Sequence, residues 1–464
     1  MKTDTKFLID RTIAVPLAWA TNLAARTAGQ ILQRDHHVVL EQVHTIAVAK
    51  LLGMGSIIQA TPMLNDLRRS FPGAKILFLT TKANKGLIER LGMIDEGIYV
   101  DDSNPTVLAA TTAQAVAQLL ARKVDLYFDL EVYSAGASVL SVLSGARNRV
   151  GFYRGSARFK KGIYTHLTVF NPRAPISAIY RQLHLSVGGH SSMDATYGPI
   201  LVRKADEESL HATLAKHAIA LEPRFVVVNP NASDLLLERR WPMEKYVQLI
   251  TQLTSRGEQV VLVGAKSEAS YVGKIMGLLT PAARARTIDT SAKLSLGELF
   301  ALIKSAACVV TNDTGPMHFA IALDRPTVCL FGPVSPDHYG VRKSNVETLY
   351  HAVYCSPCAH EIDTPPCAGV NVCMQLILVP EVLAAVNRQL AGKPAPVRLP
   401  LVDVSYSGPH GGALGVIVRS SVDTAAESAD GASFAPRPGD AGAADDAPVS
   451  EVVEMSADSR AVPR

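Results

Sequence analysis

Residues 308–318 read CVVTNDTGPMH, in which four strand-forming residues run into a polar turn that ends in Gly315 and Pro316. The apolar run predicts a buried strand, and a proline directly after the turn predicts the first residues of a helix. At the start of such a helix the backbone N–H groups are free and the dipole is positive, which suits a phosphate or diphosphate. The stretch therefore predicts a strand–turn–helix unit of an α/β fold, with an anion site at the turn.

Four residues of this turn are candidates for binding a diphosphate: Asp313, Thr314, Gly315 and His318. Thr314 offers a hydroxyl group, and Gly315 has no side chain to keep a ligand away from the backbone. His318 lies near the first helical turn, and Asp313 is placed to orient the turn itself. An ordinary strand–turn–helix, with Asp313 or Thr314 as a helix cap, is the alternative interpretation.

The residues that follow extend this block into a longer pattern. Residues 313–318 have the pattern Asp-Thr-Gly-x-x-His, and the residues that follow, 319–333, read FAIALDRPTVCLFGP. This second stretch contains an alanine-containing helix and then Pro-Thr-x-x-x-Phe-Gly-Pro. The whole block resembles the signature of glycosyltransferase family 9, the heptosyltransferases of the lipopolysaccharide core. Weaker matches are KLLGMGS at 50–56, followed by Thr61-Pro62, and NPNA at 229–232, followed by Arg-Trp-Pro at 240–242. Together the resemblance covers roughly residues 44–390.

The resemblance implies a fold, a reaction and a location. The fold would be GT-B, in which two Rossmann-like domains face each other across a cleft. The reaction would be inverting transfer of heptose from ADP-heptose to a lipopolysaccharide core or related glycan acceptor. It would take place in the cytoplasm, at the inner face of a bacterial inner membrane. No metal cofactor is expected, and no Asp-x-Asp pair that could hold one occurs in the part of the chain predicted to be ordered.

Composition agrees with a two-domain globular protein and excludes several other classes. The chain has 464 residues, of which 48% are hydrophobic and 19% charged, and its net charge is +4. This length allows two ordinary cores, and the small charge without a basic stripe does not favour nucleic-acid binding. Six cysteines in such a long chain do not form a disulfide scaffold. No apolar run reaches the length of a membrane-spanning helix.

Two series of alternating strands and helices predict two parallel sheets with helices on both faces. The first series has predicted strands at 45–50, 74–80, 97–100 and 124–130 and helices at 57–70, 82–91, 106–121 and 135–143. The second has predicted strands at 225–228, 260–263, 285–289 and 308–311 and helices at 242–255, 266–279, 296–305 and 380–390. The polar, basic stretch at 147–161 is expected to be either a solvated loop or a contact for an acidic acceptor.

The predicted organisation has four parts. Residues 1–43 form an N-terminal amphipathic segment, 44–195 an acceptor domain, 196–393 a nucleotide-sugar donor domain, and 394–464 a tail. The tail is rich in Ala, Gly, Ser, Pro and Asp and is expected to be disordered, because it has few large apolar residues to bury. The N-terminal segment is expected either to lie on the inner leaflet through Trp19 and Leu23 or to pack on the first domain.

Further donor-binding residues are expected where the strands of the second series end. Asn229 follows one of these strands, and either Arg239 or Arg240 would supply a cation that can grip a phosphate with two hydrogen bonds. Glu268 follows the next strand and is placed to accept hydrogen bonds from ribose hydroxyls. A helix-start glutamate that only favours the helix dipole is the alternative for Glu268.

The N-terminal loop departs from the family pattern. Gly53 and Gly55 would let a sugar or phosphate approach the backbone, but no acidic residue about twenty positions later supports a nicotinamide cofactor. Many heptosyltransferases have Asp, their expected general base, where this chain has Ser56. A serine cannot serve as the base without help, so we expect Glu131 to replace it, with Asp129 as second choice. A solvated acid at a strand end is the alternative.

Four cysteines near the end of the second series, Cys355, Cys358, Cys367 and Cys373, are expected to belong to a structural loop. A zinc site is the alternative, although the spacings are not those of a known zinc module.

Four functions are therefore open from the sequence. Heptose transfer is the first, and use of another nucleotide sugar by the same fold is the second. A non-catalytic nucleotide-sugar-binding protein, with Ser56 as the mark of lost activity, is the third. A zinc-dependent interaction module built on the four cysteines is the fourth, and it predicts stoichiometric metal in the purified protein.

Overall fold

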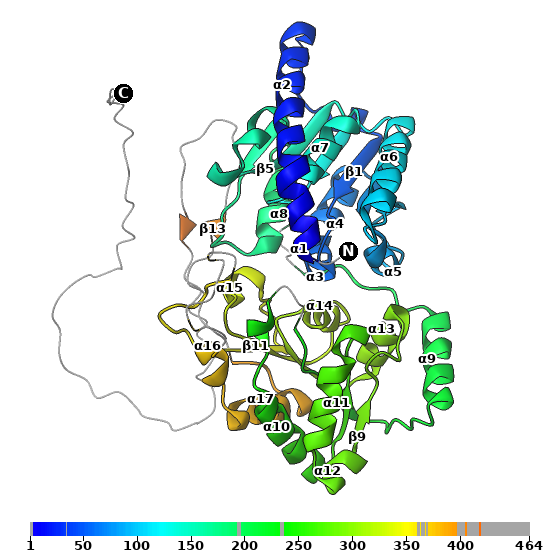
Figure 1. Cartoon of the computed structure of the whole chain (residues 1–464), viewed down its shortest axis with the longest axis vertical. Helices are drawn as coiled ribbons and strands as arrows, with labels where there is room; N and C mark the ends of the chain where they lie inside the picture. Colours follow the sequence, from blue (N-terminus) through cyan, green and yellow to red (C-terminus); the bar gives the residue numbers. More distant parts are fainter. Residues whose placement is uncertain are drawn as a thin grey trace, which may run out of the picture. The chain divides into compact units, whose positions relative to one another are not determined.

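The computed structural model describes two six-stranded sheets of parallel strands, each accompanied by its own helices (Figure 1). It covers residues 3–33, 35–192, 196–232, 236–359, 362, 367, 370–396, 404–405 and 417–418. Most of the predicted tail, 394–464, lies outside the described residues. Within it, β13 (Val404–Ser405) and β14 (Ile417–Val418) form an antiparallel pair.

The first sheet has six parallel strands in the order β3-β2-β1-β4-β5-β6. Its strands are β1 (Thr45–Ala49), β2 (Lys75–Thr81), β3 (Glu96–Val100), β4 (Leu126–Asp129), β5 (Asn148–Tyr153) and β6 (His166–Val169). Its helices are α3 (Met54–Gln59), α4 (Thr61–Ser70), η3 (Lys82–Asn84), α5 (Lys85–Ile88), α6 (Pro105–Ala121), α7 (Ala135–Leu143), η4 (Gly155–Gly162) and α8 (Ile176–Leu185). The central strands are buried on both faces, as continuous apolar runs in a parallel sheet require.

The second sheet repeats this topology in the order β12-β11-β10-β7-β8-β9. Its strands are β7 (Phe225–Asn229), β8 (Gln259–Leu262), β9 (Thr287–Asp289), β10 (Cys308–Asn312), β11 (Thr327–Phe331) and β12 (Val346–Tyr350). Its helices are α9 (Lys204–Lys216), η5 (Leu237–Arg239), α10 (Met243–Ser255), η6 (Lys266–Glu268), α11 (Ala269–Leu278), α12 (Pro281–Ala285), α13 (Leu296–Ser305), α14 (Gly315–Ala322), α15 (Pro336–Tyr339), α16 (Val372–Gln375) and α17 (Val379–Leu390).

The predicted α/β class and the two series of strands are confirmed, with local differences. The predicted helix at 57–70 is two helices, α3 and α4, because Pro62 has no N–H to donate and marks a new helix start. The stretch at 147–161 is wrongly expected to be a loop: it contains β5 and η4. The sequence pattern also missed β6, α8, α9 and β12.

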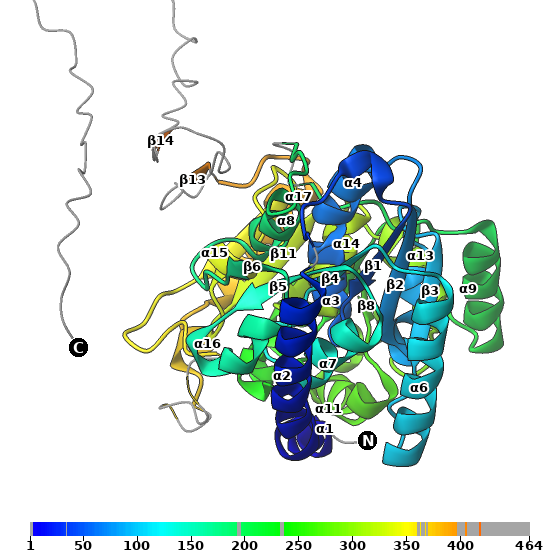
Figure 2. The same ribbon diagram turned by 90° about the horizontal axis from the view of Figure 1, so that it is seen from above.

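The N-terminal segment is helical along most of its length. It consists of α1 (Thr3–Ile9), a π-helical turn η1 (Asp10–Ala14) and α2 (Val15–Leu32), followed by η2 (Leu40–Gln42). Figures 1 and 2 show α2 on the outside of the first sheet, beside α7. None of the described helices is long and apolar enough to cross a membrane.

Strand order fixes where a ligand can bind. In each sheet the chain adds strands first toward one edge and then toward the other, and this reversal lies between β1 and β4 and between β7 and β10. Ligands bind at the carboxyl ends of the strands beside such a switch point. Ala49 pairs with Asp129 at one of these ends, and Asn229 pairs with Thr311 at the other. The loops after these four strands carry most of the predicted site residues.

Candidate functional site

A cleft of about 910 Å³ opens where the loops after the strands of the two sheets meet. From the first sheet it is lined by the loop after β1 and by Tyr133 after β4; from the second, by the loops after β7, β8 and β10. The helices that start at the cleft, α3 and α14, pack against each other. Of the predicted residues, those that line the cleft are Gly53, Gly55, Ser56, Asn229, Arg239, Glu268, Asp313, Thr314, Gly315 and His318.

On the side of the second sheet, Asn229 ties two strand ends together. Its Nδ2 donates to Thr311 Oγ1 at 3.1 Å and to Thr314 Oγ1 at 2.9 Å. Thr314 is the N-cap residue of α14, and its side chain does not cap the helix. The start of α14 is therefore held in place by a buried amide, while its first turn faces the cleft.

One arginine of the predicted pair lies in the cleft and the other does not line it. Arg239 donates from Nη1 to the Asp313 carbonyl oxygen at 3.0 Å, and the same nitrogen is 3.7 Å from Asp313 Oδ2. Burial raises the pKa of the Asp313 carboxyl group, and Arg239 acts in the opposite direction. The guanidinium of Arg240 instead lies over the ring of Tyr271, 4.2 Å from its centroid.

His318 is enclosed between the two sheets. Its Nδ1 lies 3.3 Å from the hydroxyl of Tyr197, and a methyl group added at Gly55 would lie 2.5 Å from its Cδ2. Burial, reinforced by the nearby Arg239, lowers the pKa of His318 to about 3. The imidazole is therefore neutral at physiological pH and can take part in hydrogen bonding but not in charge pairing.

We predict that His318 makes folding stability fall on acidification. Its pKa is about 3 in the folded protein and about 6.5 in an unfolded chain, so below pH 6.5 only the unfolded chain takes up this proton. Stability then decreases by about 1.4 kcal/mol per pH unit as pH falls, which amounts to about 2 kcal/mol at pH 5. In His318→Gln, denaturant unfolding should show a correspondingly smaller loss between pH 7 and pH 5. An unchanged pH dependence in the variant would contradict this assignment.

We predict that Gly55→Ala disturbs the cleft, because its new methyl group would collide with the His318 ring. Overpacking of this kind costs about 1–3 kcal/mol of folding stability, and here it would also displace a cleft-lining side chain. Gly273→Ala is the matched control, since no atom lies within 4 Å of the added methyl group. Thermal unfolding of both variants measures the difference; equal stability would contradict the close approach.

Glu268 ends the short helix η6 after β8 and lines the cleft. One carboxylate oxygen, Oε2, accepts a hydrogen bond from the backbone N–H of Ala265 at 2.7 Å. This contact fixes the side chain at the loop. Both interpretations from the sequence, a ribose acceptor and a helix-start glutamate, agree with this position.

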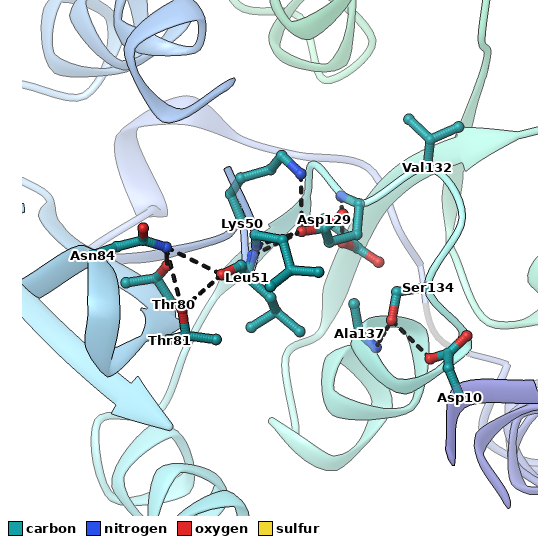
Figure 3. A network of polar contacts seen from close by, with 12 residues as sticks. Asp10, Lys50, Leu51, Thr80, Thr81, Asn84, Asp129, Val132, Ser134 and Ala137 are labelled. Atoms are coloured by element: carbon teal, nitrogen blue, oxygen red, sulfur yellow. Dashed lines mark hydrogen bonds and ion pairs between the residues drawn. The ribbon is translucent and has the colours of Figure 1, made fainter. Parts of the chain in front are cut away.

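On the side of the first sheet, Glu131 joins the loops after β1 and β4. Figure 3 shows this region, with Lys50 and Leu51 after β1 close to Asp129 at the end of β4. Its Oε1 accepts from the backbone N–H groups of Leu51 and Leu52, at 2.8 and 3.1 Å, and lies 2.9 Å from Lys50 Nζ. Burial alone would raise the pKa of Glu131, but Lys50 and the two N–H groups outweigh it and hold the pKa below its usual range. Within the described part of the chain, Oε2 accepts no hydrogen bond. Glu131 is therefore ionised and anchored through one oxygen.

The loop that Glu131 holds carries Gly53 and Ser56. Gly53 has a φ of +87°, a conformation that glycine adopts without strain. Ser56, in the first turn of α3, lines the cleft and forms a hydrogen bond with the buried hydroxyl group of Tyr180. Burial raises the pKa of Tyr180, as does the negative charge of Glu131, while the contact with Ser56 lowers it.

Asp129, the last residue of β4, lies two residues before Glu131 and is fully buried. It accepts hydrogen bonds from the Tyr164 hydroxyl and from the backbone N–H of Glu131. Burial raises the pKa of Asp129 to about 6, although Lys160, Tyr164 and Glu131 N–H act to lower it. Neither Asp129 nor Glu131 lines the cleft; their neighbours Ser56 and Tyr133 do.

In the basic stretch at 147–161, Lys160 and Arg149 make structural contacts, whereas Arg147, Arg158 and Lys161 are exposed. Lys160 is fully buried, and its Nζ donates to the carbonyl oxygens of Glu131 and Val132 at 2.7 and 2.9 Å. Arg149 donates to the carbonyl oxygens of Ala146 and Ile163. The expectation of a solvated loop is therefore wrong for these two side chains. Lys160 stabilises the turn at Glu131 and Val132, and Arg149 joins the residues before and after β5.

The sequence motifs also missed cleft residues that lie outside them. Tyr133, Gln59 and Tyr339 line the cleft, and Gln59 donates from Nε2 to the carbonyl oxygen of Tyr339 at 3.2 Å. Tyr133 could have been found from its position, two residues after Glu131 at the same strand end. Nothing in the pattern around Gln59 or Tyr339 would have identified them.

The cysteines lie beside the second sheet. Cys373 is buried, whereas Cys355, Cys358 and Cys367 are half-buried. No group of three or more Cys, His, Asp or Glu residues is placed to hold a metal ion in the portion of the chain that the structure describes. Residues 360–361, 363–366 and 368–369 lie outside the described residues.

Comparison with known proteins decides the family. The family model described as glycosyltransferase family 9 (heptosyltransferase) matches residues 114–368, more than half of the 464-residue chain. The chain belongs to glycosyltransferase family 9. The resemblance seen in the sequence is thereby confirmed, and the family 9 protein is a glycosyltransferase.

Curated relatives and a solved structure extend this result. The chain is 37% identical over 120 residues to lipopolysaccharide heptosyltransferase 2 of Salmonella typhimurium, which covers 25% of this chain and 34% of that protein. It is 24% identical over 309 residues to lipopolysaccharide heptosyltransferase 2 of Escherichia coli K12, which covers 65% of this chain and 87% of that protein. The structure of E. coli ADP-heptose lipopolysaccharide heptosyltransferase II has a TM-score of 0.63 and 20% identity, and covers 75% of this chain and 99% of that one. The family 9 protein therefore has the GT-B fold that the sequence predicted.

Proposed function

We propose that this family 9 protein transfers heptose, with inversion, from ADP-heptose to a lipopolysaccharide core or a related glycan. The observation that carries the proposal is the start of α14, where Thr314, Gly315 and Arg239 line the cleft opposite the Gly53–Ser56 loop. The relatives named above act as lipopolysaccharide heptosyltransferases, which supports the choice of sugar and acceptor. We infer that the reaction takes place in the cytoplasm, at the inner face of the inner membrane.

The donor would bind to the loops of the second sheet. Its diphosphate would lie at the start of α14, where backbone N–H groups, the Thr314 hydroxyl and Arg239 supply hydrogen bonds and positive charge. The neutral imidazole of His318 would line the same position. Glu268 would accept hydrogen bonds from the ribose hydroxyls, and the apolar side chains of Leu294, Leu296 and Leu299 would cover the adenine ring of the donor.

Transfer with inversion needs a base on the side of the sugar opposite the leaving diphosphate. In this cleft the diphosphate side belongs to the second sheet, so the base must come from the first. As the acceptor O–H bond breaks, its oxygen attacks C1 of heptose, the C1–O bond to the diphosphate breaks, and ADP leaves. Arg239 and the α14 N–H groups would stabilise the charge that develops on the diphosphate.

We propose Glu131 as the group that takes the acceptor proton, through Oε2. Its Oε1 is held by Lys50 and by the N–H groups of Leu51 and Leu52, which would fix the direction of the second oxygen. Asp129 is the second choice, because it is fully buried and bonded to Tyr164. Ser56 would then position the acceptor rather than accept its proton.

Ser56 also supports a second candidate function. Without a carboxylate at this position, the protein could bind a nucleotide sugar without turning it over. A related enzyme that uses another nucleotide sugar is a further alternative, because the fold does not specify the sugar. A measurement of turnover distinguishes heptose transfer from non-catalytic binding, and a measurement of donor preference distinguishes it from transfer of another sugar.

Donor preference can be tested by titration calorimetry with ADP-heptose, UDP-glucose and GDP-mannose. We expect ADP-heptose to bind at least tenfold more tightly than the other two, a difference of about 1.4 kcal/mol or more. Equal or tighter binding of a UDP- or GDP-sugar would overturn the proposed donor while leaving the fold and family unchanged.

A further inference from the structure

The N-terminal helix α2 presents an apolar face that is largely exposed, although the Trp19 ring packs edge-on against Phe159, with 6.5 Å between the ring centroids. Trp19 is 53% exposed, Leu23 66% and Ile31 80%, all on α2. We name this surface the N-terminal apolar face; it consists of Leu17, Trp19, Ala20, Leu23, Ala24 and Ile31, all of which are exposed. Three- and four-residue spacings place these side chains on one side of the helix. Large exposed apolar patches of this kind mark interaction surfaces.

The opposite side of the same helices is fixed to the first sheet. Ala18 and Asn22 are buried, and Asn22 Nδ2 donates to the carbonyl oxygen of Phe159. Asp10, in the π-helical turn, accepts from the Ser134 hydroxyl at 3.0 Å, as Figure 3 shows. It also accepts from Ala135 N–H at 3.0 Å and Gly136 N–H at 2.9 Å, at the start of α7. The direction of the N-terminal apolar face is therefore set by buried polar contacts on the other side of the helix.

The exposed charged side chains nearest to Trp19 and Leu23 are positive, and exposed Asp35 lies beyond the end of α2, four residues after Ile31. Residues 12–25 contain no charged side chain, and exposed Arg11 and Arg26 stand at the two ends of this stretch. Asp10 is turned inward to the start of α7. Arg158 and Lys161 are exposed on η4, which packs against α2, and Gly162 of η4 lies next to the Arg26 side chain.

We propose that the N-terminal apolar face docks the protein on an anionic phospholipid surface. Leu23, Ile31 and Trp19 would enter the boundary between headgroups and acyl chains, and Arg11 and Arg26 would contact the phosphates. The helix lies on the surface and does not span it, since no described helix is suited to cross a bilayer. A lipid surface fits better than a second copy of the chain, because a symmetric pair of these faces would bring the arginines of both copies together. The proposal does not depend on the identity of the transferred sugar.

The chain contains its own reporter for this contact. It has two tryptophans: Trp19 lies on the N-terminal apolar face, whereas Trp241 is fully buried beneath α10 and the second sheet. Insertion should shift the Trp19 emission to shorter wavelength and make it quenchable by brominated acyl chains, over a constant Trp241 background.

The test uses the full-length protein and vesicles of phosphatidylethanolamine with phosphatidylglycerol, compared with vesicles of phosphatidylcholine. We expect sedimentation with the anionic vesicles, a blue shift of Trp19, and at least about tenfold weaker binding to the neutral vesicles. Leu23→Glu/Ile31→Glu should weaken binding by at least about tenfold, and Arg26→Gln by about fivefold. The matched control is Leu120→Glu/Leu278→Glu, which alters two exposed leucines of α6 and α11 and should bind like the wild type.

Failure of the folded wild type to bind anionic vesicles would overturn the proposal, as would unchanged binding of Leu23→Glu/Ile31→Glu. The molar mass of the protein in solution, measured by light scattering, shows whether it forms a dimer. A dimer that Leu23→Glu/Ile31→Glu dissociates, without lipid binding by the wild type, would assign the face to a second copy and overturn the proposal as well.

Discussion

Glu131→Gln is expected to lower kcat for heptose transfer by about 10²–10⁴-fold, the usual contribution of a general base. Donor affinity should change by less than about threefold, because Glu131 belongs to the first sheet, whereas the donor would bind to the loops of the second. The amide can keep accepting from Leu51 and Leu52 N–H through its oxygen, so the loop stays in place. Single-turnover rates and donor Kd, measured on the same preparation, separate the two effects.

Glu131→Gln also removes the negative charge that pairs with Lys50, so the buried Lys50 cation is left without a counter-charge. Removing one partner of a buried ion pair costs about 3–5 kcal/mol of stability. If Glu131→Gln does not fold, Lys50→Met/Glu131→Gln removes the pair together and should lose turnover equally. Asp129→Asn tests the second choice. Near-normal turnover of folded Glu131→Gln, or a larger loss in Asp129→Asn, would reject Glu131 as the base.

Ser56→Asp offers a complementary test of the same assignment. It restores the carboxylate that many members of the family have at this position, and Ser56 lines the cleft. Introduced into Glu131→Gln, it should recover at least about tenfold in kcat, since either carboxylate could take the acceptor proton. A merely structural role of Glu131 predicts no recovery.

Arg239→Ala is the second variant with a large expected effect, a loss of about 10²–10³-fold in kcat/KM. Arg239 lines the cleft beside Thr314 and would offset the charge of the leaving diphosphate. Arg239→Lys should keep only part of the activity, because the positive charge remains but the forked geometry that allows two hydrogen bonds to a phosphate is lost. The order wild type, Arg239→Lys, Arg239→Ala is therefore expected in steady-state kinetics.

Arg240→Ala distinguishes the two arginines that the sequence could not separate. Its guanidinium lies on Tyr271, so its removal should affect donor affinity less than Arg239→Ala does. The reverse order would show that the ligand-bound cleft recruits Arg240, and would contradict the role proposed for Arg239.

The signature block was predictable because its chemistry is local. A strand, a polar turn, a glycine and a proline lie within 308–318, and β10 and α14 are found there. Asn229 was placed correctly at a strand end, but its bonds to Thr311 and Thr314 depend on strand order, which the sequence does not state. The choice between Arg239 and Arg240 likewise depends on backbone direction in a loop.

The first sheet was harder to predict, because its last third does not look like a sheet. β5 contains Arg149, and η4 contains the buried Lys160, whose charge suggested a solvated loop. Burial of that lysine becomes favourable only when carbonyl oxygens of Glu131 and Val132 converge on it from another loop. Residues far apart in the chain create this environment, so no local pattern could reveal it.

Of the two alternatives for the N-terminal segment, the structure shows packing on the first domain, and lipid contact stays a proposal. One side of α2 packs on the first sheet through Ala18 and Asn22, while Trp19 and Leu23 face outward. Amphipathicity could not separate packing from lipid contact, because a helix with two apolar sides can make both contacts.

The most direct test of the central claim is ADP release when purified protein is mixed with ADP-heptose and a lipopolysaccharide-core acceptor extract. UDP- and GDP-sugars are assayed in parallel, and each reaction is repeated without acceptor. The account predicts ADP release that requires both ADP-heptose and the acceptor, with a heptosylated product detected by mass spectrometry. Release only from another nucleotide sugar, or none from any donor by folded protein that binds ADP-heptose, would contradict it.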